Sequence, residues 1–163
     1  MTGPTLNRKD LRAVKATQAK RLEDVRFGPV RKGRLPKPLD KLSGANLAAT
    51  PLYEVGADLR VAFVAKTAAA REQRQLYGWA FQATERGLLP LARLDYHPSH
   101  KGLHLVLNCE RGLDLTNRGL PGCREFALGD VELDADEEKD RNKFVALFCQ
   151  RLGIELGKAG GLL

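Results

Sequence analysis

The sequence has no long apolar run and no recognisable leader, and each absence removes a class of protein. No stretch of its 163 residues approaches the roughly 20 consecutive apolar residues that a membrane-spanning helix needs. The N-terminus, MTGPTLNRKDLRAV, lacks the apolar stretch and the small-residue cleavage site of a signal peptide. The sequence therefore predicts a cytoplasmic protein that has no membrane partner.

Cysteine is also scarce. The three cysteines, Cys109, Cys123 and Cys149, form no CxxC pair, and their odd number does not fit a disulfide framework. We expect reduced side chains that pack as small hydrophobes, and no zinc site built on the cysteines alone.

Several catalytic and binding motifs are missing as well. The sequence contains no GxxxxGK[ST] phosphate loop, no GxSxG nucleophile turn and no HExxH metal motif. The acidic run over 130–140 superficially resembles a calcium loop, but it lacks glycine at the sixth position and has Arg141 at the twelfth. We interpret this run as a solvated helix start or as a docking place for a basic segment.

What the sequence does have is positive charge in one region. Residues 8–37 hold eleven Lys and Arg against three Asp and Glu, a net +8, whereas everything from residue 38 onward holds sixteen against seventeen, a net −1. Such asymmetry favours an anionic partner, most often nucleic acid, although a charged run can also be only a solvated face. The cations predicted to contact phosphate here are Arg8, Lys9, Arg12, Lys15, Lys20, Arg21, Arg31, Lys32 and Arg34.

The same region predicts a helix followed by a linker. Over 6–26, the apolar residues Leu11, Val14, Leu22 and Val25 recur at helical spacing. Glycines and prolines then interrupt regular structure over 28–51. We therefore predict two parts, a basic N-terminal helix with its linker over 1–51 and a globular domain over 52–163.

The second part predicts an α+β fold. Short β-like runs occur at 59–66, 76–83, 88–96 and 102–109, with a weaker one at 124–128. A helix begins after Asp134, where acidic residues fill the first turn, and ends at Gly153. The predicted architecture is an antiparallel meander of four to five strands packed against this C-terminal helix.

Two hairpins can be given a register. A loop over 84–87 pairs Tyr77 with Leu94, Trp79 with Ala92 and Phe81 with Pro90, which places the three aromatic residues on one buried face. A loop over 97–102 pairs Tyr96 with Leu103 and Asp95 with His104. In this scheme Asp95 and His104 lie on the face opposite Trp79.

All three histidines of the chain, His97, His100 and His104, fall near the second hairpin. A carboxylate such as Asp95 beside an imidazole fixes its tautomer and raises its basicity, while Arg93 and Lys101 can hold a phosphate. These are the groups that a metal-independent endoribonuclease needs, so His100, His104 and Asp95 are the predicted catalytic residues. No cofactor is then required.

Other interpretations of the hairpin stay open. It can be an ordinary polar turn, because Pro98, Ser99 and Gly102 are common turn residues. Alternatively, His97, His100 and His104 could bind zinc with Asp95 or Cys109 as a fourth ligand. The main rival function is a non-enzymatic subunit that binds nucleic acid or takes part in an assembly. Its basic segment would contact a phosphate backbone, or the acidic run at 130–140 of a partner or a second copy.

Overall fold

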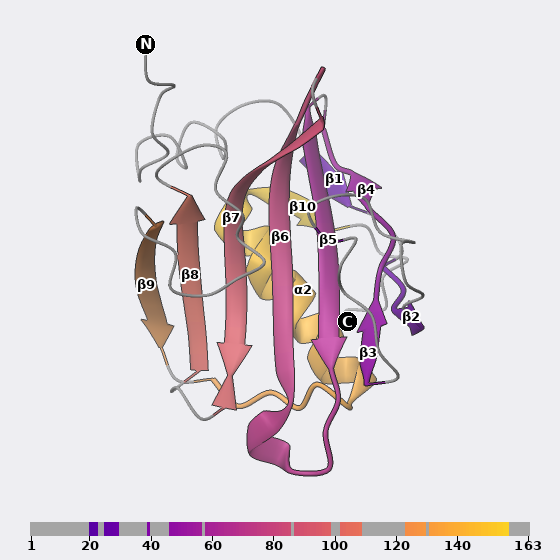
Figure 1. Ribbon diagram of the computed structural model, residues 1–163, viewed down its shortest axis with the longest axis vertical. Coiled ribbons are helices and arrows are strands. Elements are labelled where there is room, and N and C mark those ends of the chain that lie inside the picture. The colour runs from indigo at the N-terminus through magenta and orange to yellow at the C-terminus, as the bar shows by residue number, and fades with distance from the viewer. Residues whose placement is uncertain are drawn as a thin grey trace.

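A computed structural model describes residues 20–22, 25–29, 39, 46–56, 58–85, 87–98, 102–108, 123–129 and 131–156 of the chain. One large, mainly antiparallel sheet dominates it, and a single long helix lies behind that sheet in Figure 1. The strands of this sheet follow the order β2-β3-β5-β6-β7-β8-β9, and β4 also pairs with β5. Their bounds are Gly28–Pro29 (β2), Leu47–Ala49 (β3), Tyr53–Glu54 (β4), Leu59–Lys66 (β5), Gln75–Thr84 (β6), Gly87–His97 (β7), Gly102–Asn108 (β8) and Cys123–Gly129 (β9).

The five strands from β5 to β9 pair in sequence order, each antiparallel to the next. This is the predicted meander, and its combination with a C-terminal helix confirms an α+β fold. The segment over 68–74, which has helical composition, contains only a short 3₁₀ turn at Arg71–Gln73 between β5 and β6. No helix in the described part of the chain has the length and apolar character of a membrane span.

The helix α2, Glu138–Leu152, forms where the sequence predicts it. Glu138 and Asp140 lie in its first turn, where carboxylates are favoured by the helix dipole, and Gly153 ends it in the left-handed conformation that glycine adopts without strain. One face of α2 is buried against the sheet through Phe144, Val145, Phe148, Cys149 and Leu152. Burial raises the pKa of the Cys149 thiol to about 12, so this cysteine is a packing residue.

The main core lies between the sheet and α2. Phe63 of β5 meets Phe148 of α2 edge to face, with ring centroids 4.8 Å apart. Gly78 of β6 lies beneath this pair, and a Cβ atom there would come within 2.8 Å of the Phe148 ring. The absence of a side chain at Gly78 is what lets the helix approach the sheet this closely.

A second apolar cluster covers the other face of the sheet, which we call the outer face. It contains Trp79 and Phe81 of β6 together with Leu39, which is fully buried although it comes from the Gly- and Pro-rich stretch before β3. The prediction that Trp79 is buried is therefore confirmed, but its side chain lies on the face away from α2.

This placement corrects the predicted register of the first hairpin. Phe81 does face Pro90, but a β-bulge follows, so Trp79 faces Arg93 and Tyr77 faces Asp95. The predicted pairings of Trp79 with Ala92 and Tyr77 with Leu94 are wrong by one residue. Proline has no N–H to donate to a strand ladder, and bulges are where a central strand tolerates it. The Pro90 carbonyl accepts a hydrogen bond from the buried Asn108 side chain at 2.9 Å.

The N-terminal region departs from the predicted helix over 6–26. Lys20–Leu22 form strand β1, which pairs in parallel with strand β10, Ile154–Leu156, directly after α2. Leu22 and Val25 both belong to the main core. The helix prediction is thus wrong for Lys20–Leu22, and its part before residue 20 lies outside the described residues.

Candidate functional site

The outer face of β7 carries a row of three polar side chains, Arg93, Asp95 and His97. Alternation along a strand points every second residue to the same face, and the pairing of Arg93 with Trp79 identifies that face as the outer one. All three are buried, with 2%, 1% and 1% of their surface exposed. Buried charges in proteins are normally paired, and this row is paired internally.

Asp95 lies between the other two members of the row. The Arg93 Nε atom donates a hydrogen bond to Asp95 Oδ1 at 2.6 Å. The Nε2 atom of His97 lies 4.0 Å from Asp95 Oδ2. The carboxylate therefore holds a guanidinium on one side and has an imidazole within ion-pair distance on the other.

His104 of β8 stands directly opposite Asp95, as the sequence predicts. The rest of the predicted second hairpin also forms, with Tyr96 opposite Leu103. Unlike the row on β7, His104 is only half-buried. The prediction that this pair lies on the face opposite Trp79 is wrong, because the bulge at Pro90 brings both onto the same face as the indole.

Two aromatic side chains of β6 border this polar group. Tyr77 stacks on Trp79 with ring centroids 5.6 Å apart, and the Tyr77 and His97 rings meet at a steep angle with their centroids 5.3 Å apart. The Tyr77 hydroxyl donates a hydrogen bond to Gln75 Oε1 at 2.5 Å. The site thus combines an aromatic pair, a buried Arg–Asp–His row and the half-buried His104, and the sequence predicted neither the aromatic neighbours nor the inclusion of His97 in the row.

The structure brings together only some of the predicted site residues. Asp95, His104 and Arg93 share one face, but Arg93 is bonded to Asp95 and its side chain is 3% exposed. His100 and Lys101 lie outside the described residues. Among the described residues, no group of three or more His, Cys, Asp or Glu could hold a metal ion. Because His100 and Cys109 are not among them, the zinc interpretation stays a prediction.

Most predicted phosphate-binding cations of the N-terminal region also lie outside the described residues. These are Arg8, Lys9, Arg12, Lys15, Arg31, Lys32 and Arg34. Lys20 and Arg21 lie in β1, where the described structure covers their backbone and not their side chains.

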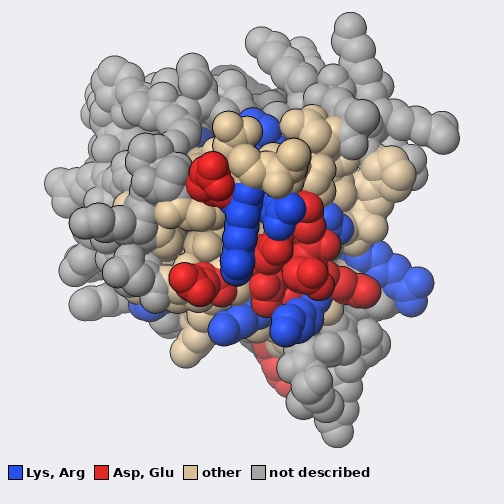
Figure 2. Space-filling model, turned by 90° about the horizontal axis from the view of Figure 1, so that it is seen from below, with Lys and Arg blue, Asp and Glu red and all other residues tan. Residues whose placement is uncertain are grey.

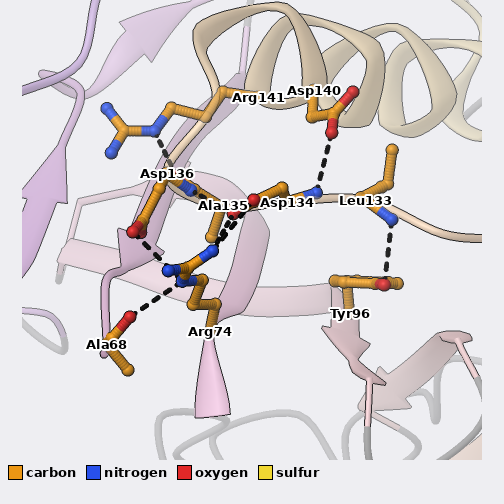
Figure 3. Close-up of polar contacts among 9 residues, drawn as sticks. All are labelled: Ala68, Arg74, Tyr96, Leu133, Asp134, Ala135, Asp136, Asp140 and Arg141. Atoms are coloured by element: carbon orange, nitrogen blue, oxygen red, sulfur yellow. Dashed lines mark hydrogen bonds and ion pairs between the residues drawn. The ribbon is translucent and has the colours of Figure 1, made fainter. Parts of the chain in front are cut away.

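The acidic run before α2 is joined to the sheet by an arginine (Figure 3). Arg74, at the start of β6, donates two hydrogen bonds from Nη1 to the Asp134 carboxylate, at 2.9 and 3.1 Å. Its Nε atom lies 3.1 Å from Asp136 Oδ2 and donates to the Ala68 carbonyl at 2.8 Å. We call this group the Arg74 clamp. The sequence contains its residues, but nothing in their spacing shows that they meet.

The clamp affects the acidity of Asp134. The pKa of this carboxyl is lowered from its ordinary value, chiefly by the hydrogen bond from the Asp136 backbone N–H. Burial opposes this shift, and the nearby Arg74 guanidinium adds to it. Asp140 accepts a hydrogen bond from the Asp134 N–H at 2.8 Å and so also steadies the helix start.

The end of the molecule that carries the clamp shows acidic and basic side chains interleaved (Figure 2). Glu72 and Glu138 are exposed acids, and Arg71 and Lys139 are exposed bases. Since Asp134 and Asp136 are already bonded to Arg74, fewer carboxylates of the run remain for the predicted contact with a partner's basic segment. That contact stays a prediction.

Comparisons of the chain with protein-family models, with curated proteins and with solved structures found no match.

Proposed function

We propose that this protein binds nucleic acid through phosphate contacts made by the cationic N-terminal region. The observation that carries this proposal is the charge distribution, a net +8 over residues 8–37 against −1 for the rest of the chain. Nucleic acid is the most common partner of such a region. Its binding is favourable because each Lys or Arg that meets a phosphate releases condensed counterions.

Phosphate contact fits the region better than base stacking does. Phe27 is the only aromatic residue between 8 and 37. Its ring packs against the main core and lies under the Arg141 guanidinium, 5.4 Å from ring centroid to Cζ. A ring held in this way is not available to stack on a base, so we expect binding that depends little on sequence.

The test is to remove charge at constant chain length. One variant replaces Arg31, Lys32, Arg34 and Lys37 by Gln, and the matched control replaces four exposed cations of the domain, Arg71, Lys139, Lys143 and Arg151. Both variants lose four positive charges. Binding to a labelled DNA duplex is measured by fluorescence anisotropy from low to moderate salt.

If four phosphate contacts are lost, the slope of log K against log salt falls by about 3–4 in the first variant. The control variant should keep the slope and most of the affinity. Equal losses in the two variants would mean that only net charge matters, and the proposal would then be wrong.

A second candidate function is RNA cleavage at His104. The observation that favours it is the register that places His104 directly opposite Asp95. Asp95 is enclosed and bonded to Arg93, so it could orient or polarise an imidazole but could not itself contact RNA in this arrangement. His104, which is only half-buried, would take the 2′-hydroxyl proton, and His100 would protonate the leaving oxygen.

This candidate is tested with end-labelled RNA in the presence of EDTA. Cleavage by the unmutated chain that is lost in His104→Gln and slowed in His100→Gln, with duplex binding unchanged, would support it. Cleavage that requires added zinc would support the metal interpretation instead. No cleavage, or cleavage that survives His104→Gln, would exclude RNA cleavage at His104 and leave nucleic-acid binding as the proposed function.

A further inference from the structure

Partly exposed polar side chains lie at one end of the outer face of the sheet, next to the buried row of β7. They are Lys66 at the end of β5, Gln75 and Tyr77 at the start of β6, and His104 near the start of β8. These strand ends lie together at the lower edge of the sheet in Figure 1. All four side chains are half-buried, so each of them reaches solvent in the folded chain. We call this group the polar strip.

Strand pairing places the members of the polar strip close to one another. Lys66 stands opposite Gln75, and Tyr77 stands opposite Asp95, which in turn stands opposite His104. Each member is an even number of residues from a side chain of the apolar cluster in its own strand, so all four lie on the outer face. Neighbouring strands are about 4.8 Å apart, so roughly 10 Å separates the backbone of Tyr77 from that of His104.

The Tyr77 ring is held in place by its neighbours. The Trp79 ring stacks on it, and the His97 ring meets it at a steep angle. Its hydroxyl donates a hydrogen bond to Gln75 Oε1. A side chain that is already ordered loses little conformational entropy when a ligand packs against it. Because Tyr77 also reaches solvent, its ring is a preformed contact for another planar group.

The polar groups around this ring suit an anion. Lys66 carries a positive charge, and His104 can donate a hydrogen bond from its ring N–H whether it is neutral or protonated. The neighbouring Asp95 carboxylate is 1% exposed and is bonded to Arg93, so its charge is offset. An ordered aromatic ring between two groups that can bind phosphate is the arrangement that proteins use for unpaired nucleotides.

We propose that the polar strip binds a single-stranded segment of nucleic acid, with one base packed on the Tyr77 ring and neighbouring phosphates bound by Lys66 and His104. This inference rests on the proposed function, and it adds a second contact surface that is specific for unpaired nucleotides. A duplex keeps its bases stacked inside the double helix. It can therefore use the cationic N-terminal region but not the Tyr77 ring.

The first arm of the test removes the ring. Tyr77→Leu is compared with Leu88→Ala, because Leu88 packs against the same apolar cluster near the turn between β6 and β7. Fluorescence anisotropy measures binding of oligo-dT and oligo-U of about 12 nucleotides, within the usual site size, and of a DNA duplex.

We expect Tyr77→Leu to bind both single strands about tenfold more weakly, which is the usual loss when one base–aromatic contact is removed. Its duplex binding should stay unchanged. Tyr77→Phe keeps the ring and should keep the affinity, and Leu88→Ala should bind as the unmutated chain does. A Tyr77→Leu variant that keeps its affinity for single strands, or loses affinity for the duplex equally, would overturn the inference.

The second arm removes one charge. Lys66→Gln is compared with Lys143→Gln, because Lys143 is exposed on α2, behind the sheet. Loss of one phosphate contact should lower the slope of log K against log salt by about 0.7 for a single strand. Lys143→Gln should keep the slope. A Lys66→Gln variant that also keeps it would contradict the inference.

The ring signals of His104 show where the strand binds. The chain has only three histidines, so the His104 signals can be assigned by comparison with His104→Gln in NMR spectra. They should shift when oligo-dT is added and stay in place when the duplex is added. Should Tyr77→Leu fail to fold, this measurement and the Lys66→Gln comparison still decide the question.

The outcomes separate this inference from the proposed function. No binding of duplex or single strand by the unmutated chain would overturn both. Single-strand binding that is indifferent to Tyr77 and Lys66, but is lost in the four-charge variant of the N-terminal region, would overturn this inference alone. Single-strand binding that depends on Tyr77, with duplex binding unchanged in the four-charge variant, would support the polar strip and overturn the role proposed for the N-terminal region.

Discussion

At the scale of single residues, Gly78 lies where the core is too tightly packed for a side chain. A methyl group at this position would lie 2.8 Å from Cδ2 of Phe148 and 3.0 Å from Cδ1 of Phe63, and neither ring has free space around it. Protein interiors are packed densely enough that an added methyl forces neighbouring side chains to shift.

We therefore expect Gly78→Ala to lower the free energy of unfolding by about 1–3 kcal/mol, the usual cost of overpacking a core. Gly28→Ala is the matched control, because a Cβ atom at Gly28 meets nothing within 4 Å. Urea unfolding followed by circular dichroism measures both. A Gly78→Ala protein as stable as Gly28→Ala would show that α2 does not press on the sheet at this point.

Single residues also show what the sequence could and could not predict about the site. The pairing of Asp95 with His104 follows from a short loop between two regular strands, and the prediction is correct. The residues of β7 that share a face with Trp79 were predicted wrongly. One extra residue in β7, next to Pro90, moves every later side chain of that strand to the opposite face. Pro90 in the middle of a strand was the signal, because a proline there marks a bulge or an edge.

At the scale of elements, the Arg74 clamp joins the start of β6 to the start of α2. Its bonds to Asp134 connect two segments that are distant in the sequence, and Arg141 adds a hydrogen bond from its Nε atom to the Ala135 carbonyl at 2.6 Å. Charge-assisted hydrogen bonds of this kind are stronger than neutral ones. The clamp therefore ties the segment that leads into α2 to the segment that leads into β6.

The pKa of Asp134 gives the clamp a pH dependence. A carboxyl whose pKa is lower in the folded than in the unfolded state stabilises the fold when the pH is above the unfolded-state pKa, here 3.8. That contribution is lost as the pH falls through the folded-state pKa. We expect Asp134→Asn to cost about 1.5–3 kcal/mol at neutral pH, the range for hydrogen bonds to charged groups.

The cost of Asp134→Asn should shrink as the pH is lowered below about 4, because the carboxyl of the unmutated chain is then protonated, first in the unfolded state and at lower pH in the folded state. Unfolding in urea at pH 7 and pH 3 measures the difference. Asp58→Asn makes the same chemical change at an exposed position and should have little effect at either pH. A difference between Asp134→Asn and the unmutated chain that stays constant with pH would exclude a role for the charge.

Elements were predictable where their partners are near in the sequence. The sequences of strands β5 to β9 and of helix α2 contain the apolar periodicity, turn residues and capping residues typical of each element. A local sequence pattern is therefore sufficient to predict them. Strand β1 is different, because its partner β10 lies at the other end of the chain. The cations and apolar residues around Lys20–Leu22 have helical spacing, and only the contact with β10 makes them a strand.

At the scale of the whole molecule, some of the described residues before residue 51 are paired with strands that follow it. The sequence suggests a boundary near residue 51, yet β1 pairs with β10 and β3 pairs with β5, and both partners come after that boundary. Leu22, Val25 and Leu39 are buried in the two apolar clusters.

The difference between an appended arm and an integral region can be measured by truncation. Removing residues 1–19 leaves every described contact in place, so we expect the thermal unfolding midpoint to stay within a few degrees of that of the full chain.

Removing 1–38 also deletes β1, β2, Leu22 and Val25. Losing two buried apolar side chains costs about 3–6 kcal/mol, a large share of the roughly 5–15 kcal/mol that stabilise a domain. The longer truncation should therefore unfold at a much lower temperature or not fold at all. If both truncations unfold at the same temperature as the full chain, residues 20–38 are an appendage, and the two-part division suggested by the sequence is correct.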